Sequence, residues 1–194
     1  MSSKPFHRWR VPLGFAFGFV YLWLARPDSW TIWACMVFLV LMGCAIRAWA
    51  AGYLLKGKRV AVGGPYAYVR NPLYLGSFIM AMGFCLALWR NPLPLTSVVL
   101  WLLFAGGFFF VYTAKIKSEE AELCQSLGQP YKDYSMRVPA FFPVKGHILG
   151  LGDQHFSFDL YKRNREYQCL LGSLFFIGVL SYRLCCTYRL RFHL

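Results

Sequence analysis

Apolar residues dominate the chain in five runs, and basic, polar or glycine- and proline-rich segments separate one run from the next. These runs are residues 11–25, 30–46, 72–89, 92–114 and 167–180. A helix needs about 20 apolar residues to cross the hydrocarbon core of a bilayer. The pattern therefore predicts an all-α polytopic membrane protein of about five transmembrane helices. No repeat divides the chain, so we expect a single domain over residues 1–194.

The boundaries of the runs refine this prediction. Only Arg90 and Asn91 separate the third run from the fourth, which predicts a tight antiparallel helical hairpin. The basic N-terminal segment and first run imitate a signal peptide, but Pro27 makes a poor cleavage context, so we expect an uncleaved helix. The second helix is expected to continue to Leu55. The fifth run is shorter, and its basic tail leaves open whether it crosses completely.

Composition and charge agree with a membrane protein. The chain is 58% hydrophobic and only 15% charged, against about 25% charged residues in a typical soluble domain. Its net charge of +13 comes from lysines and arginines that flank apolar runs, without a zinc-finger or RNA-binding signature, so we expect no nucleic-acid partner. With the N-terminus in the cytosol, 15 of the 21 basic residues fall on the cytosolic side. Residues 56–70 and 115–165 then both face the cytosol.

Seven cysteines are spread along the chain: Cys35, Cys44, Cys85, Cys124, Cys169, Cys185 and Cys186. None forms a CxxC pair, no histidine-rich segment accompanies them, and most lie inside apolar runs. Buried cysteine behaves as a small hydrophobic residue, so the sequence predicts neither a disulfide framework nor a metal site. The adjacent Cys185 and Cys186 could alternatively be acylated in a eukaryotic host.

The first candidate site is the segment 63–76, which opens the third apolar run. Two glycines and a proline make a turn that lets backbone approach a ligand, and Pro72 suits the first turn of a helix. Arg70 and Asn71 would then stand at the positive end of that helix, where a carboxylate or phosphate binds well. A plain turn with an interfacial aromatic belt, including Tyr66 and Tyr74, is the alternative.

The second candidate site is the acidic segment that follows the fourth apolar run. The helix is expected to extend to Leu127, because Gly128 and Pro130 give a stop signal. Lys115 and Glu119 are four residues apart and share a face, which is also typical of a solvated, salt-bridged helix. Alternatively, three glutamates beside the membrane could bind the hydroxyl, ammonium or sulfonium groups of a cationic cofactor.

Two further polar residues adjoin apolar runs. Arg47 lies close to the end of the second run, where it either snorkels to the surface or meets a headgroup or cofactor. Glu166 precedes the fifth run, and we expect it to cap the N-terminus of that helix. The tyrosine- and proline-containing segment 131–143 reads by itself as an interfacial loop.

Taken in order, these motifs resemble the isoprenylcysteine carboxyl methyltransferases and their phospholipid N-methyltransferase relatives. The matching stretches are Gly64–Gly76, Glu119–Glu120, Gly128–Tyr134 and Val138–Pro143, so that the resemblance covers about residues 45–145. The chain departs from the family pattern at Asn71, where relatives have histidine, and at Ala140, where they have arginine. Asparagine can bind a cofactor by hydrogen bonds, but it cannot act as an acid or base near neutral pH. The missing arginine weakens any assignment of a carboxylate substrate.

The resemblance implies an S-adenosylmethionine-dependent methyltransferase and a role for each matching residue. The residues expected to bind the cofactor are Lys58, Arg59, Val60, Ala61, Tyr66, Arg70, Asn71, Pro72, Leu73, Tyr74, Glu119 and Glu120, with 58–61 strand-like. Lys115 and Arg47 are expected to meet the polar group of the substrate. No residue is assigned as a catalytic acid or base, and no metal is expected.

The resemblance also implies an amphiphilic or lipid substrate in a bilayer, with the site facing the cytosol. The membrane would be the bacterial cytoplasmic membrane, or the endoplasmic reticulum in a eukaryote. The methyl acceptor is left open among carboxyl, amine and thiol groups, and so is the oligomeric state. Two alternatives stand beside this function: an NADPH-dependent membrane reductase of the sterol-reductase type, and a non-catalytic membrane scaffold.

Overall fold

The computed structural model describes residues 18–27, 29–55, 59–89, 94–143 and 154–192, and this part of the chain is helical without any strand. Its elements are α2 (Trp30–Ala51), η1 (Gly64–Ala67), α3 (Pro72–Leu86), α4 (Pro94–Leu127), α5 (Gln129–Arg137), α6 (Phe158–Arg163) and α7 (Tyr167–Phe192), and residues 18–24 are also helical. The predicted all-α class is confirmed. Among the described residues, α2, α4 and α7 are long and apolar enough to cross a membrane, while α3 is an apolar helix of 15 residues.

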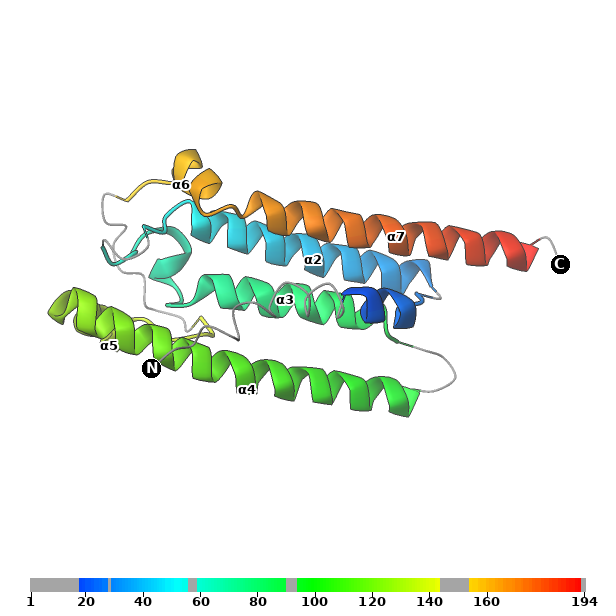
Figure 1. The fold of residues 1–194 in the computed structure, drawn as a ribbon, viewed down its shortest axis with the longest axis horizontal. Helices are drawn as coiled ribbons and strands as arrows, with labels where there is room; N and C mark the ends of the chain where they lie inside the picture. Colours follow the sequence, from blue (N-terminus) through cyan, green and yellow to red (C-terminus); the bar gives the residue numbers. More distant parts are fainter. Residues whose placement is uncertain (1–17, 28, 56–58, 90–93, 144–153, 193–194) are drawn as a thin grey trace.

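Helices α2, α3 and α7 form a closely packed bundle, with α2 between its two neighbours in Figure 1. Met36, Val40 and Leu180 are fully buried in its core. The backbones of α2 and α3 touch at paired glycines: a Cβ atom added to Gly43 would lie 2.5 Å from the carbonyl oxygen of Gly76. Lipid gives helices little hydrophobic reason to associate, so small residues that allow close contact favour this pairing.

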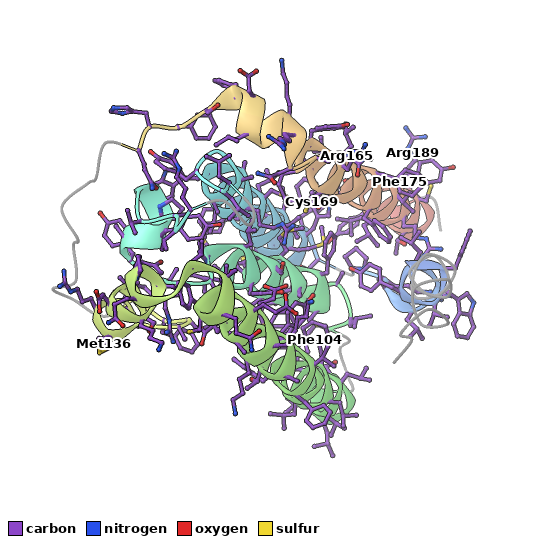
Figure 2. All side chains as sticks on the ribbon, turned by 60° about the vertical axis from the view of Figure 1, so that its left-hand side comes forward. Phe104, Met136, Arg165, Cys169, Phe175 and Arg189 are labelled. Atoms are coloured by element: carbon purple, nitrogen blue, oxygen red, sulfur yellow. The ribbon has the colours of Figure 1, made fainter. Side chains whose placement is uncertain are left out.

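Helix α4 forms a separate wall beside this bundle (Figures 1 and 2). It meets α3 mainly through aromatic rings, with Phe78 contacting Phe108 and Phe109, and through the indole nitrogen of Trp101, which donates a 3.0 Å hydrogen bond to the carbonyl of Cys85. The apolar side chains of α4 are largely exposed, as expected for a helix that faces lipid. The third and fourth runs thus form a hairpin, but a loosely joined one.

The end of α4 and the length of α7 can be compared with the sequence predictions. Helix α4 does extend to Leu127, where Gly128 adopts a left-handed conformation (φ 64°) and α5 begins at once. The fifth apolar run proves longer than its sequence suggested, because a membrane-length helix covers Tyr167–Arg189. Arg183 on this helix donates to the carbonyls of Leu22 and Ala25, which close the helix at residues 18–24, so part of the basic tail has a structural partner.

The polar elements gather at one end of the bundle. Figure 1 shows η1, α5 and α6 at the same end as the C-terminus of α2 and the N-termini of α3 and α7. The two polar segments that the sequence placed on one side of the membrane therefore lie together. The side chain of Asn164 joins the second of these segments to the end of α2 by donating to the carbonyls of Ala51 and Leu54.

Candidate functional site

A cavity of about 720 Å³ lies at this end of the molecule, between α4 on one side and η1, α3 and the end of α2 on the other. Ten of the residues predicted for cofactor or substrate line it: Arg47, Arg59, Val60, Ala61, Tyr66, Arg70, Leu73, Tyr74, Lys115 and Glu119. Asn71, Pro72 and Glu120 do not line the cavity, but Asn71 and the lining residue Arg70 both contact Glu120. Lys58 falls outside the described residues. Arg59, Val60 and Ala61 are extended or bent loop residues, and they form no strand.

The turn before α3 is shaped by Gly64, which has a φ of 56°. A side chain there would strike the ring of Tyr53, so the turn needs glycine both for its conformation and for space. The following 3₁₀ turn buries Tyr66, whose carbonyl accepts a 2.8 Å hydrogen bond from the hydroxyl of Tyr134. The turn is therefore fixed to α5, and the ring of Tyr66 is held at the cavity wall.

The N-terminus of α3 is joined to the acidic part of α4 by a polar network. Asn71 Nδ2 donates to Glu120 Oε1 at 3.2 Å and to the carbonyl of Ala140 at 3.0 Å. Arg70 Nη2 lies 3.3 Å from the same carboxylate oxygen. Asn71 thus joins the start of α3 to α4 and to the segment after α5. Ala140 contributes its backbone carbonyl, at the position where the family pattern has an arginine side chain.

Arg70 also has an unused donor. Its side chain lines the cavity and is only 17% exposed, and its Nη1 donates to the carbonyl of Ser135. Its Nε is buried and has no hydrogen-bond partner among the described residues. A buried donor without an acceptor is costly. The guanidinium of Arg70 is therefore held by Ser135 and Glu120 while its Nε stays unpaired within the described part of the chain.

Helix α4 brings carboxylates to the opposite wall. Lys115 and Glu119 form the predicted i, i+4 ion pair at 3.3 Å, and both line the cavity together with Glu122. Tyr74 of α3 lines the same cavity, and Glu120 of α4 accepts a hydrogen bond from Asn71 at the start of α3. The central structural expectation, that the start of the third span meets the acidic extension of the fourth, is therefore met.

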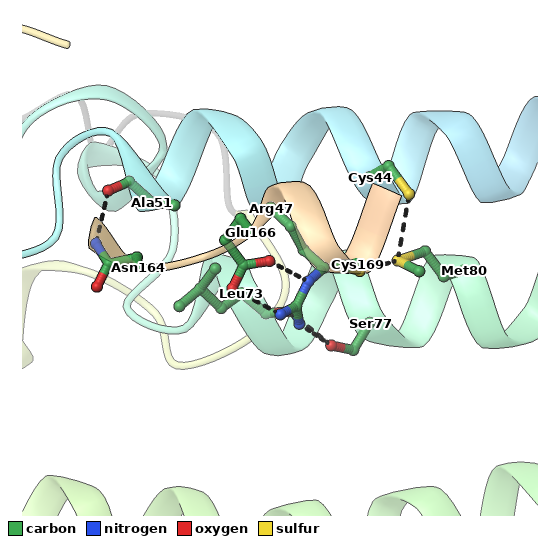
Figure 3. A network of polar contacts seen from close by, with 9 residues as sticks. All are labelled: Cys44, Arg47, Ala51, Leu73, Ser77, Met80, Asn164, Glu166 and Cys169. Atoms are coloured by element: carbon green, nitrogen blue, oxygen red, sulfur yellow. Dashed lines mark hydrogen bonds and ion pairs between the residues drawn. The ribbon is translucent and has the colours of Figure 1, made fainter. Parts of the chain in front are cut away.

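Arg47 lines the cavity and is also paired within the protein. Its Nε and Nη2 donate to the two carboxylate oxygens of Glu166 at 3.0 and 2.8 Å, and Nη1 donates to the carbonyl of Leu73 and the hydroxyl of Ser77 (Figure 3). This bidentate geometry is the strong form of an ion pair. The carboxylate of Glu166, expected to act as a helix cap, instead neutralises Arg47 at the edge of the cavity.

Three tyrosines near the cavity stay neutral over the physiological range. Burial raises the pKa of Tyr66 and Tyr134 well above the ordinary value of 10. Burial, with a smaller contribution from the carboxylate of Glu120, raises the pKa of Tyr131 to about 12. Removing a phenol from water disfavours its charged form. These side chains therefore offer rings and hydrogen-bonding hydroxyls rather than a base.

Some residues of the site carry no sequence signal for their role. Gln154 pins the loop beside the cavity: its Oε1 accepts from the amides of Val62 and Gly63 at 3.0 and 3.1 Å, and its Nε2 donates to the carbonyl of Val60 at 3.0 Å. No sequence signal marks Gln154, which lies more than 90 residues away from its partners. Tyr131, by contrast, belongs to a segment that was noted but read as an interfacial loop.

The fold and the cavity define a polytopic helical membrane protein with a polar site at one end of its bundle. The chain is 25% identical over 177 residues to the cobalt-zinc-cadmium resistance protein CzcN of Cupriavidus metallidurans, which covers 88% of this chain and 76% of that relative. It is 36% identical over 89 residues to the protein-S-isoprenylcysteine O-methyltransferase of Schizosaccharomyces pombe, covering 46% of this chain and 35% of the relative. It is 33% identical over 81 residues to the methanethiol S-methyltransferase of Crocosphaera subtropica, covering 42% and 28%.

These similarities confirm the resemblance seen in the sequence: the chain is similar to isoprenylcysteine carboxyl methyltransferase-like membrane methyltransferases. It spans only about a third of the length of the two named methyltransferases. No family model and no solved structure matches the chain.

Proposed function

We propose that this protein transfers a methyl group from S-adenosylmethionine to an amphiphilic substrate at the cytosolic surface of a membrane. The observation that carries the proposal is the cavity in which the N-terminal part of α3 faces Lys115, Glu119 and Glu122 of α4. The methyltransferase names among the relatives favour this reaction over the reductase and scaffold alternatives.

The residues present fit such a cofactor. The guanidinium of Arg70, which lines the cavity, would attract the carboxylate of the methionyl part, and the carboxylates of Glu119 and Glu122 suit its ammonium group or the ribose hydroxyls. The buried rings of Tyr66 and Tyr131 offer apolar faces to the adenine. When bound, the cofactor would supply an electrophilic methyl group on a positively charged sulfur.

The neighbouring residues then act by holding these groups in place. Asn71 and Pro72 do not line the cavity, so we assign them to fixing Arg70 and the start of α3 rather than to direct contact. Arg47 is saturated by Glu166, Leu73 and Ser77, and therefore positions this edge of the cavity. Lys115 is half exposed on the wall, which makes it the better candidate for contact with the polar group of the substrate.

The cavity also has an apolar side that suits an amphiphile. Leu54, Leu55, Leu73, Leu123 and Leu127 line it together with the charged residues. A substrate could rest its apolar part there and present a carboxylate, amine or thiol to the cofactor. Methyl transfer of this kind needs alignment and exclusion of water more than a basic side chain, which agrees with the absence of an assigned acid or base.

Binding is the first test. Detergent-solubilised protein should be stabilised against heat by S-adenosylhomocysteine and not by NADPH. Glu119→Gln should weaken that stabilisation, whereas Asp133→Asn, whose partner Gln129 is exposed on α5, should leave it unchanged. No shift with S-adenosylhomocysteine, or an equal shift with NADPH, would refute the proposal.

Activity is the second test. Protein incubated with methyl-labelled S-adenosylmethionine should label a component of a native lipid extract or a small hydrophobic thiol. Fractionating the products would identify the acceptor class. Label that appears equally with Glu119→Gln protein would show that the cavity is not the site of transfer.

A further inference from the structure

Three sulfur atoms from three different helices converge in the core of the bundle. Cys44 of α2 and Cys169 of α7 both direct their thiols toward the thioether of Met80 on α3 (Figure 3). The Sγ of Cys44 lies 3.9 Å from the Sδ of Met80, and the Sγ of Cys169 lies 3.7 Å from it. The three sulfurs therefore form a triangle, two sides of which are these contacts with Met80.

The two measured sides of this triangle match the spacing of sulfur ligands around a metal ion. With metal–sulfur bonds of about 2.3 Å, sulfurs in a trigonal or tetrahedral arrangement lie about 3.8–4.0 Å from one another. The observed spacings of 3.7 and 3.9 Å fall close to that range without any movement of the helices. Two thiols and a thioether are soft ligands, of the kind that selects Cu(I) over hard cations.

We propose that Cys44, Met80 and Cys169 form a binding site for one Cu(I) ion. Binding releases the two thiol protons as one Cu⁺ enters, so the three-sulfur complex carries one negative charge and no electron is transferred. Arg47 lies one helical turn from Cys44, and its charge is already paired with Glu166. The site is distinct from the methyl-transfer cavity and does not depend on the function proposed for it.

A second cavity gives the site an approach. It has a volume of about 220 Å³ and is lined by Cys44, Cys169, Tyr161 and Glu166 together with apolar residues of α2 and α7. Glu166 also lines the larger cavity, so its ion pair with Arg47 stands between the two. The hydroxyl of Ser173 lies 3.6 Å from the Sγ of Cys44, where it would orient that ligand.

The sequence predicted no metal, because the three donors share no short spacing. Within the described part of the chain, no group of three histidine, cysteine or acidic side chains could hold a metal. The thioether of Met80 therefore provides the third ligand beside the two thiols. A bound ion would connect α2, α3 and α7, and metal binding should therefore stabilise the whole bundle.

Full-length protein in detergent should be titrated anaerobically with Cu(I) against a chromogenic Cu(I) chelator. We expect one tightly bound Cu(I) per chain. Cys44→Ser and Cys169→Ser should each abolish it, and Met80→Leu, which nearly conserves volume, should weaken it by about tenfold or more. Cys35→Ser and Cys124→Ser should bind as the unaltered protein does, because neither cysteine belongs to the triangle.

X-ray absorption at the copper edge gives a second measurement that does not need the serine variants to fold. The unaltered protein should show three sulfur neighbours at about 2.3 Å, and Met80→Leu protein should show two. Nitrogen or oxygen neighbours, or copper binding that persists unchanged in Cys44→Ser/Cys169→Ser protein, would overturn the assignment.

Discussion

The bundle of α2, α3 and α7 and the adjoining helix α4 are both apolar, yet they are packed in opposite ways. Gly43 and Gly76 bring two backbones of the bundle into contact, and neither position has room for a Cβ atom. Gly106 and Gly107 on α4 have nothing within 4 Å. Phe110 of α4 is 82% exposed, whereas Met36 and Val40 of α2 are fully buried. Apolar residues thus form a helix–helix interface in the bundle of α2, α3 and α7, but a lipid-facing surface on α4.

The same contrast runs through the polar side chains around the cavity. Arg47 and Glu166, both from the bundle, form a bidentate pair with side chains only 21% and 11% exposed. Lys115 and Glu119 on α4 form a single contact, with side chains 59% and 39% exposed. One wall of the cavity is therefore fixed by the core of the protein, and the other can adjust. This difference would suit the amphiphilic substrate that we propose.

The largest expected effect follows from breaking the buried ion pair. Arg47→Met leaves the carboxylate of Glu166 without its partner, and should lower the free energy of unfolding by about 3 kcal/mol. Lys115→Met breaks the exposed pair on α4 and should cost less than about 1 kcal/mol. Denaturant unfolding in detergent, followed by circular dichroism, measures both. Equal losses would show that the two walls do not differ in rigidity.

The next effect tests the packing of the helices directly. Gly76→Ala places a Cβ atom 2.6 Å from Arg47 Cγ and 2.8 Å from the carbonyl oxygen of Gly43, so the helices must separate. We expect a loss of about 2 kcal/mol. Gly107→Ala meets nothing and should leave stability unchanged or slightly higher. Thermal unfolding of the two variants under identical detergent conditions would decide, and a destabilised Gly107→Ala would show that α4 has a partner.

Sequence reasoning found the features that lie close together along the chain. The extension of α4 to Leu127 followed from its apolar run and the Gly128 stop, and Pro72 marked the start of α3. The meeting of the α3 N-terminus with Glu119 and Glu120 was also expected, since the resemblance linked those motifs.

Contacts between distant helices could not be predicted. Arg47 and Glu166 are 119 residues apart, and the Cys44–Met80–Cys169 triangle joins three helices. Because membrane helices are apolar on nearly every face, hydrophobic periodicity does not indicate which side meets a neighbour. The sequence therefore does not indicate in which direction the side chain of Arg47 points.

A third prediction concerns the loop that closes the fixed wall. Gln154→Leu removes the side chain that holds the amides of Val62 and Gly63, so the loop at residues 59–64 should open. If that loop binds the cofactor, affinity for S-adenosylhomocysteine should fall by about tenfold, or ~1.4 kcal/mol, with little change in unfolding. Gln129→Leu, which removes an exposed contact to Asp133, is the control. Faster amide exchange in the loop without a change in affinity would separate the loop from the binding site.

The smallest effect addresses whether α4 moves as a unit. Trp101→Phe removes the indole hydrogen bond to the Cys85 carbonyl, and Trp33→Phe removes the matching bond from α2 to Ser181 of α7. Each should cost about 1 kcal/mol or less, because a neutral hydrogen bond contributes little net stability. The two variants should differ in where amide exchange becomes faster. For Trp101→Phe, exchange should quicken only in α4, since α4 has few other contacts with the bundle. For Trp33→Phe, exchange should quicken across α2 and α7. If Trp101→Phe quickened exchange throughout, α4 would belong to the same cooperative unit as the bundle, and the adjustable wall would have to be sought in η1 and its loop.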